Sequence, residues 1–280
     1  MNGFLKRFLN RDWLLRMMGK LGVRGFLWRV YCRCFGPGGG ILRLNLGAYH
    51  ARFYVHSQWV FTDLKSFGGE HDLLALLTTA VKSGDTVYDI GANMGLHAVF
   101  LGQAVGDQGL VLAFEPETHL CERLRANAAL NGLKNVRIIP LALGDHSYTS
   151  GFLPSERGTA APRLAELTPE KPGLTPLQKV HVVQGDELVE REQFPLPRLV
   201  KIDVEGHEHA VIRGLTRTLS NPACQLLCCE IHPQLLPEGL SPKDILELLK
   251  SCGFTRFSTR QRSTEQHVLA FKGGIEAPQD

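Results

Sequence analysis

The stretch Val87-Tyr88-Asp89-Ile90-Gly91-Ala92-Asn93-Met94-Gly95 decides the fold, because a short apolar run ends there in an acidic residue and a glycine-spaced turn. A second apolar run begins at Val111 and ends in Glu115, about twenty-five residues after the first, which is the spacing of one strand-helix-strand unit. Gly91 and Gly95 allow the backbone to turn sharply beside a ligand, and the next helix offers its free N–H groups there.

The turn favours a nucleoside-type ligand over a dinucleotide. Asn93 stands where a middle glycine would be, and the chain contains no Gly-x-Gly-x-x-Gly to pack against a pyrophosphate. Glu115 can accept both ribose hydroxyls, and Asp145, after the third strand, is placed to accept from an adenine amino group. We therefore expect S-adenosyl-L-methionine, a common ligand with one ribose and no phosphate. A bare structural turn, with an Asx turn at Asp145, is the alternative.

Continuous apolar runs alternate with helical patterns through the rest of the chain, which predicts an α/β fold with a Rossmann-like, doubly wound, mostly parallel sheet. A closing, partly antiparallel pair of strands is expected at the C-terminal end. The expected strands are 86–90, 110–114, 136–141, 199–204 and 225–231, the helices are 95–105, 117–131, 207–219 and 242–251, and the closing pair is 255–259 with 267–272.

Three further segments are set apart by composition. Residues 1–40 form a basic amphipathic arm that ends at a Gly/Pro run, and residues 41–83 form a strand and helix extension with short strands in 41–61 and a helix from Glu70 to Val81. The main domain is expected over 84–280. Within it, residues 146–180 are rich in Pro, Gly, Ser and Thr and lack periodicity, which is typical of a lid-like insertion.

Charge and cysteine content limit the cellular compartment and the kinds of partner that we expect. The arm holds eight Lys and Arg against Asp12 alone, while the whole chain carries only +3, so the remainder is mildly acidic and a nucleic-acid partner is not expected. The basic, aromatic residues 1–36 predict peripheral membrane contact, with a helix packed on the domain or an organelle transit segment as alternatives. Seven cysteines without a Cys-x-x-Cys pair favour a reducing, cytoplasmic compartment. The oligomeric state is not indicated.

Two neighbouring strands deliver acids and histidines to the edge where Glu115 emerges. The fourth strand is followed by Asp203, Glu205 and His207, and the fifth ends in Glu230-Ile231-His232. A hydroxyl nucleophile must lose its proton during methyl transfer, and histidine with a carboxylate suits that role near neutral pH. Asp203, His207, Glu230 and His232 are therefore the expected catalytic residues, whereas His97 is expected to be a packed histidine. The structural alternatives are a helix cap at Asp203, a surface position for His207 and a loop role for His232.

No metal is expected. Asp203, Glu230 and His232 could form a facial set of ligands, but no His-x-x-x-His or cysteine pair is present to require one.

Several motifs together resemble the FkbM family of S-adenosylmethionine-dependent methyltransferases over roughly residues 68–255. They are Asp89-Ile-Gly-Ala-Asn-Met-Gly95, Ala113-Phe-Glu-Pro116, Asn131-Gly-Leu-Lys-Asn-Val136, Pro140-Leu-Ala-Leu-Gly-Asp145, Lys201-Ile-Asp-Val-Glu-Gly206 and Glu230-Ile-His-Pro233. The resemblance implies a class I methyltransferase type of fold and O-methylation of hydroxyls on sugars, glycolipids or natural products. It also implies the cofactor-binding set Glu70, Asp89, Gly91, Asn93, Gly95, Glu115 and Asp145, with Glu70 at the methionine end.

The chain departs from the family pattern in its arm, in residues 146–180 and at Gly185-Asp186, where Leu-Asp is common. Two other functions stay open at this point. One is a nucleotide-dependent oxidoreductase on a similar sheet, and the other is a membrane-surface binding protein with a vestigial cofactor pocket.

Overall fold

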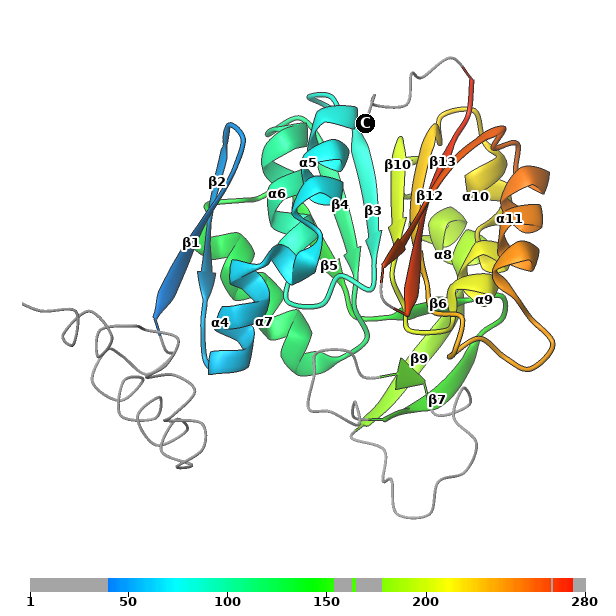
Figure 1. Cartoon of the computed structure of the whole chain (residues 1–280), viewed down its shortest axis with the longest axis horizontal. Helices are drawn as coiled ribbons and strands as arrows, with labels where there is room; N and C mark the ends of the chain where they lie inside the picture. Colours follow the sequence, from blue (N-terminus) through cyan, green and yellow to red (C-terminus); the bar gives the residue numbers. More distant parts are fainter. Residues whose placement is uncertain (1–39, 154–162, 165–177, 263, 274–280) are drawn as a thin grey trace, which may run out of the picture. The chain divides into compact units, whose positions relative to one another are not determined.

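The computed structural model describes residues 40–153, 163–164, 178–262 and 264–273 (Figure 1). Two compact units divide the chain, one comprising residues 1–44 and 52–69 and the other residues 45–51 and 70–280. The arm expected over residues 1–40 lies, up to residue 39, outside the described residues. Among the described helices there is none with the length and apolar content that a membrane crossing needs. The boundaries expected at residues 41–83 and 84–280 stay predictions.

The first unit contains a helix that the sequence pattern did not predict. Strands β1 (Ile41–Leu46) and β2 (Tyr49–Tyr54) pair with each other, as the alternation over residues 41–54 predicts. The expectation of strand over residues 58–61 is wrong, because α4 (Gln58–Lys65) begins there. The Ser57 hydroxyl accepts a hydrogen bond from the Val60 N–H at 3.1 Å, which satisfies a free donor of the first helical turn. A short 3₁₀ turn, η1 (Phe67–Gly69), ends this unit.

The second unit is built on a seven-stranded sheet. Its strands, in spatial order, are β12 (Arg256–Arg262), β13 (Glu265–Phe271), β11 (Leu226–Ile231), β10 (Leu199–Ile202), β3 (Thr86–Ile90), β4 (Leu110–Phe114) and β5 (Val136–Ile139). The strands from β11 to β5 are parallel, and β13 is antiparallel to both of its neighbours. The predicted doubly wound, mostly parallel sheet with a partly antiparallel closing pair is confirmed.

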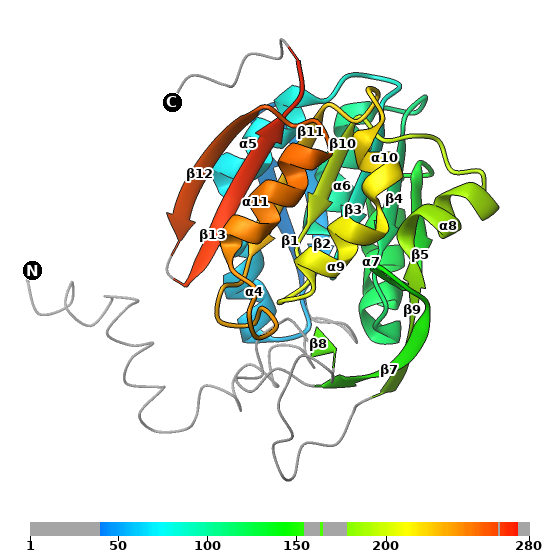
Figure 2. The same cartoon turned by 90° about the vertical axis from the view of Figure 1, so that its right-hand side faces the viewer.

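Helices cover both faces of this sheet (Figures 1 and 2). Successive residues of a strand point to opposite faces, so Val87 packs in one apolar core while Tyr88 and Ile90 pack in the other. The first core contains residues of α5 (His71–Ala80), α6 (Leu96–Val105) and α7 (Thr118–Leu130). The second contains residues of α8 (Gly185–Arg191), α9 (Glu208–Gly214), α10 (Thr216–Ser220) and α11 (Pro242–Ser251).

Two details of the helical layer differ from the sequence expectation. The single helix predicted over residues 207–219 is two helices, α9 and α10, which meet at Leu215. Helix α8 was not predicted, and the Gln184 side chain caps its first turn by accepting from the Glu187 N–H at 2.6 Å. Asp186, which follows the departing position Gly185, is buried and accepts from both the N–H and the hydroxyl of Thr218.

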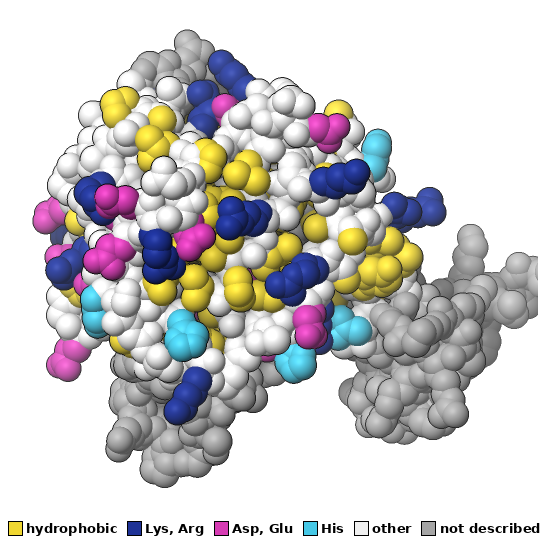
Figure 3. Space-filling view, turned by 180° about the vertical axis from the view of Figure 1, so that it is seen from behind, with side chains coloured by type: hydrophobic (Ala, Val, Ile, Leu, Met, Phe, Trp, Pro, Cys, Tyr) yellow, Lys and Arg dark blue, Asp and Glu magenta, His cyan; other side chains and the backbone are white. Residues whose placement is uncertain are grey.

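A second sheet occupies part of the predicted insertion. Its four strands, in spatial order, are β6 (Ala142–Gly144), β9 (Gln178–Gln184), β7 (Tyr148–Leu153) and β8 (Arg163–Leu164). Phe152, Leu164, Val180 and Val182 form its buried core. The described parts of 146–180 are therefore mainly strand, and residues 154–162 and 165–177 of the expected insertion lie outside the described part. On the face seen in Figure 3, Lys and Arg side chains are dispersed among acidic and hydrophobic ones.

Candidate functional site

One pocket opens where the carboxyl ends of β3, β4 and β10 meet, the edge at which doubly wound sheets bind ligands. The space between its lining atoms is about 620 Å³, open solvent at the mouth included. The loops after these strands contribute Gly91, Asn93, Glu115, Asp203, Glu205 and His207 to its lining, and the second sheet contributes Phe152 and Leu164.

The glycine turn after β3 forms one wall. Gly91 and Asn93 both have positive φ, +80° and +52°, and Gly95 is the N-cap of α6 with φ +91°. A Cβ at Gly91 would lie 1.8 Å from the carbonyl oxygen of Asp203. Only glycine therefore lets the turn come so close to the loop after β10, and this contact joins the two halves of the pocket.

Glu115 is the buried carboxylate of the pocket. Its side-chain oxygens accept from the Asn93 N–H at 2.8 Å and from the Glu117 N–H at 2.9 Å, and the residue is 4% exposed. Burial raises the pKa of Glu115 to about 7, although these two hydrogen bonds act in the opposite direction. A carboxylate has about four acceptor positions, so lone pairs remain for hydroxyl groups of a ligand.

A buried lysine joins two of the predicted acids. Lys201 Nζ lies 3.1 Å from Asp203 Oδ2, 3.7 Å from Asp89 Oδ1 and 3.4 Å from the Gly91 carbonyl oxygen. Burial alone would lower the pKa of Lys201, but the carboxylates of Asp203 and Asp89 raise it above its usual value. Burial raises the pKa of the fully buried Asp89. Asp89 is not among the residues that line the pocket. Its ion pair with Lys201 helps to hold that lysine beside Asp203.

The loop after β10 brings His207 and Glu205 to the pocket beside Asp203. Burial lowers the pKa of His207 to about 4 and raises that of Glu205 to about 7. His232 lies behind Glu205, with its Nε2 3.7 Å from Glu205 Oε2 and its Nδ1 2.7 Å from Glu208 Oε1. Burial would lower the pKa of His232, but the Glu208 carboxylate and its acidic neighbours raise it to about 10.

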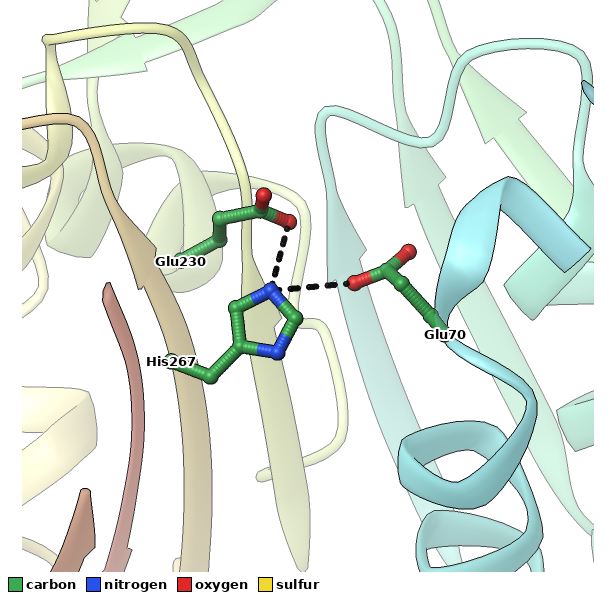
Figure 4. A group of neighbouring side chains, drawn as sticks. All are labelled: Glu70, Glu230 and His267. Carbon is green, nitrogen blue, oxygen red and sulfur yellow. Dashed lines mark ion pairs between the residues drawn. The ribbon is translucent and has the colours of Figure 1, made fainter. Parts of the chain in front are cut away.

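Glu70 and Glu230 lie together in a separate buried group with His267, outside the residues that line the pocket (Figure 4). His267 Nε2 is 3.5 Å from Glu70 Oε1 and 3.3 Å from Glu230 Oε2. Burial and the charge of Glu230 raise the pKa of Glu70. Burial acts in the same direction on Glu230, but His267 lowers its pKa overall.

Asp145, expected at the adenine edge, pairs with exposed basic neighbours. It is not among the described residues that line the pocket, and its carboxylate lies 2.8 Å from His146 Nδ1 and 3.7 Å from Arg213 Nε. Burial would raise the pKa of Asp145, but the hydrogen bond from His146 and the charge of Arg213 lower it.

The sequence analysis placed Glu205 at this edge of the sheet but gave it no role, and it did not name Lys201, Glu208 or His267 as site residues. Lys201 carried a signal, because a charged residue inside an otherwise apolar, buried strand is rare unless it is paired. Glu205 and Glu208 carried a weaker one, since both lie next to predicted site residues. His267 carried none, because its place opposite Glu230 depends on the antiparallel register of β11 and β13.

The pocket suits an adenosine-type ligand. Phe114, Leu120, Leu141 and Leu143 give it an apolar wall for a base, and Glu115 supplies a buried acceptor for ribose hydroxyls. The close approach at Gly91 leaves the backbone of the turn accessible to the same ligand.

The chain is similar to known methyltransferases. Residues 89–256 match the model of the methyltransferase FkbM domain. The chain is 30% identical over 225 residues to the hexuronic acid methyltransferase AglP of Haloferax volcanii, covering 80% of this chain and 86% of that protein. It is 27% identical to methyltransferase 1 of Beauveria bassiana over 46% of this chain and 57% of that protein. A crystal structure of a putative rRNA methylase from Clostridium thermocellum superposes with a TM-score of 0.46 and 15% identity, over 75% of this chain and 97% of that one.

Proposed function

The chain belongs to the FkbM family of methyltransferases, and we propose that it methylates a hydroxyl oxygen of a carbohydrate, glycolipid or natural-product acceptor. The methyl donor of the family is S-adenosylmethionine, which supplies an electrophilic methyl group on a sulfonium. Glu115 and the turn at Gly91 and Asn93 would hold the adenosine part. The observation that carries the proposal is the acidic rim of Asp203 and Glu205 on this pocket, since a hydroxyl acceptor must lose a proton and a carboxylate can take it.

The roles of the rim residues follow from their charges. We assign Asp203 to orient the acceptor hydroxyl, because Lys201 fixes its carboxylate at the pocket. As the C–O bond forms and the C–S bond breaks, the hydroxyl proton passes to Glu205, whose pKa of about 7 lies nearest to neutral pH. The two histidines expected from the sequence suit this step less well. His207 is a weak base with a pKa of about 4, and His232, with a pKa of about 10, is already protonated.

Two observations support the class of acceptor: the substrate of a relative and the charge of the pocket rim. The relative AglP of Haloferax volcanii is a hexuronic acid methyltransferase, and a hexuronic acid carries both hydroxyl groups and a carboxylate. The carboxylates of Asp203 and Glu205 repel an acceptor carboxylate and attract a hydroxyl, so an ether product is expected in preference to an ester.

The experiment is to incubate the purified chain with methyl-labelled S-adenosylmethionine and a panel of hexuronate-containing and neutral saccharides. We expect label in a saccharide, resistant to mild alkali, which cleaves methyl esters but not methyl ethers. The control is the same saccharide with every hydroxyl already methylated. Alkali-labile label would assign the acceptor atom to a carboxylate, and label on an amino sugar nitrogen would also refute the proposal.

The pH profile tests the proton acceptor. The reactive form of Glu205 is the carboxylate, so kcat/KM should fall about tenfold per pH unit below pH 7 and level off above it. Glu205→Gln should lower kcat/KM and remove this step from the profile, whereas Glu238→Gln, an exposed substitution, should leave it in place. The same step in Glu205→Gln would show that another group takes the proton.

A further inference from the structure

Four buried side chains at the C-terminal side of the sheet form a group of two carboxylates and two imidazoles. Glu230 on β11 and His267 on β13 are directly opposite each other in the antiparallel register, and Glu70 precedes α5. Figure 4 shows Glu70 and Glu230 converging on the His267 ring, whose Nε2 lies 3.5 and 3.3 Å from their oxygens. On the other side of Glu70, His97 Nε2 lies 3.8 Å from Oε2. The four side chains are only 6–10% exposed.

Several polar atoms of this group are aimed into it without a hydrogen bond. His97 Nε2 has no hydrogen-bond partner in the part of the chain that the structure describes. Within the same described part, neither Glu70 Oε1 nor His267 Nε2 makes a hydrogen bond of ordinary geometry. Buried polar atoms are nearly always satisfied, so these three atoms require an explanation.

We propose that Glu70, Glu230 and His267 bind a divalent transition-metal ion. One atom from each of these residues lies within 4.8 Å of the others. Ligand atoms arranged tetrahedrally around a metal, each about 2.0–2.2 Å from it, are about 3.4 Å apart. The distances from His267 Nε2 to the two carboxylates, 3.5 and 3.3 Å, are close to this value. The mixture of carboxylate and imidazole favours Mn²⁺ or Zn²⁺ over Ca²⁺, which prefers oxygen ligands alone.

The local charge balance supports the same conclusion. Two carboxyl groups face each other here, while the ion pairs of the buried Lys201 are with Asp203 and Asp89. Arg262 Nη1 lies 3.9 Å from Glu230 Oε1. A cation with two positive charges would compensate the pair and would take up the open atoms of Glu70 and His267. This inference does not depend on the identity of the methyl acceptor.

A neighbouring group of Asp203, Glu205 and His232 is also close enough to hold an ion, but it fits less well. Asp203 already accepts from Lys201, and its side chain and that of Glu205 are 26% and 28% exposed. His232 Nδ1 is bonded to Glu208. The atoms without a hydrogen bond belong to the Glu70 group, so we place the ion there.

The test is calorimetric titration of the chelator-treated, full-length protein with MnCl₂ and, separately, with ZnCl₂. We expect one ion per chain for at least one of the two metals, and an affinity at least tenfold weaker in both Glu70→Gln and His267→Asn. His232→Asn is the matched control and should bind within twofold of the unchanged protein. Glu70→Gln removes a repelling charge but little volume, so the metal-free variant should unfold at the same temperature as the metal-free unchanged protein or higher.

The same ions should raise the unfolding temperature of the unchanged protein and not that of Glu70→Gln, because an ion that binds only the folded state stabilises it. The proposal is overturned by an absence of saturable binding of both metals up to millimolar concentration. It is also overturned by unchanged affinity in Glu70→Gln and His267→Asn, or by loss of binding in His232→Asn alone, which would move the ion to the Asp203 group. None of these measurements depends on methyl transfer, so they can fail while the proposed function stands.

Discussion

Replacing Asp203 with asparagine is expected to lower turnover by about 10²–10⁴-fold while changing the affinity for S-adenosylhomocysteine by less than about threefold. The asparagine has the same shape, so the contact with the turn at Gly91 remains, because that contact uses the Asp203 backbone. What is lost is the carboxylate that Lys201 holds at the pocket at 3.1 Å. The acceptor hydroxyl then lacks the negative partner that orients it, and its proton is harder to remove.

This prediction separates chemistry from binding. Turnover is measured at saturating S-adenosylmethionine and affinity by calorimetry with S-adenosylhomocysteine. Asp107→Asn, in an exposed loop, makes the same chemical change away from the pocket and should leave both quantities unchanged. If Asp203→Asn keeps its turnover, Asp203 has no part in the reaction. If it loses cofactor affinity to the same degree as turnover, its role is in the fold of the pocket.

The central sheet could be predicted from the sequence because each of its parallel strands is a continuous apolar run between two helical patterns. A strand covered on both faces is apolar at every position, so its ends are visible in the sequence. The predicted bounds of β3 and β4 match the observed ones at every residue. The closing hairpin was predicted in position, but its strands are longer than expected at the turn.

The elements outside the sheet were harder to predict for physical reasons. Helix α4 depends on a single capping residue, Ser57, in a segment whose first half alternates as strands do. The second sheet pairs β7 with β9 across residues that carry no periodic pattern, so its register is set by tertiary contacts. The meeting of α9 and α10 at Leu215 is likewise invisible in an apolar pattern that continues through it.

Some residues of the candidate site could be predicted from local motifs, and others could not. Asn93 and Glu115 could be predicted because their positions follow from the spacing of one strand-helix-strand unit, and both line the pocket. Asp203 follows β10, and Glu230 lies near the end of the adjacent parallel strand β11, yet the structure puts them in different groups. Glu230 faces His267 across an antiparallel pair, and this partnership depends on register that no local motif encodes.

Replacing Glu115 with alanine is expected to weaken S-adenosylhomocysteine binding about 100-fold or more. Hydrogen bonds to a charged group contribute about 1.5–3 kcal/mol each, and two ribose hydroxyls would lose this partner. About 3 kcal/mol corresponds to about two factors of ten in affinity. Alanine also leaves the N–H groups of Asn93 and Glu117 without their acceptor, which loosens the turn itself.

Two further substitutions make this result specific. Glu115→Gln keeps the volume and one acceptor oxygen, so its affinity should fall less, by about tenfold. Glu122→Ala removes an exposed glutamate from the neighbouring helix α7 and should bind as the unchanged protein does. Calorimetry with S-adenosylhomocysteine measures all three variants, and far-ultraviolet circular dichroism shows whether each has folded. Equal affinity in Glu115→Ala and the unchanged protein would mean that the adenosine does not lie along this carboxylate. A buried carboxylate at the end of β4 could accept from the ribose hydroxyls of NAD(H) as well as from those of S-adenosylhomocysteine. Binding of NAD(H) in place of S-adenosylhomocysteine would therefore mean that the pocket serves a different nucleotide.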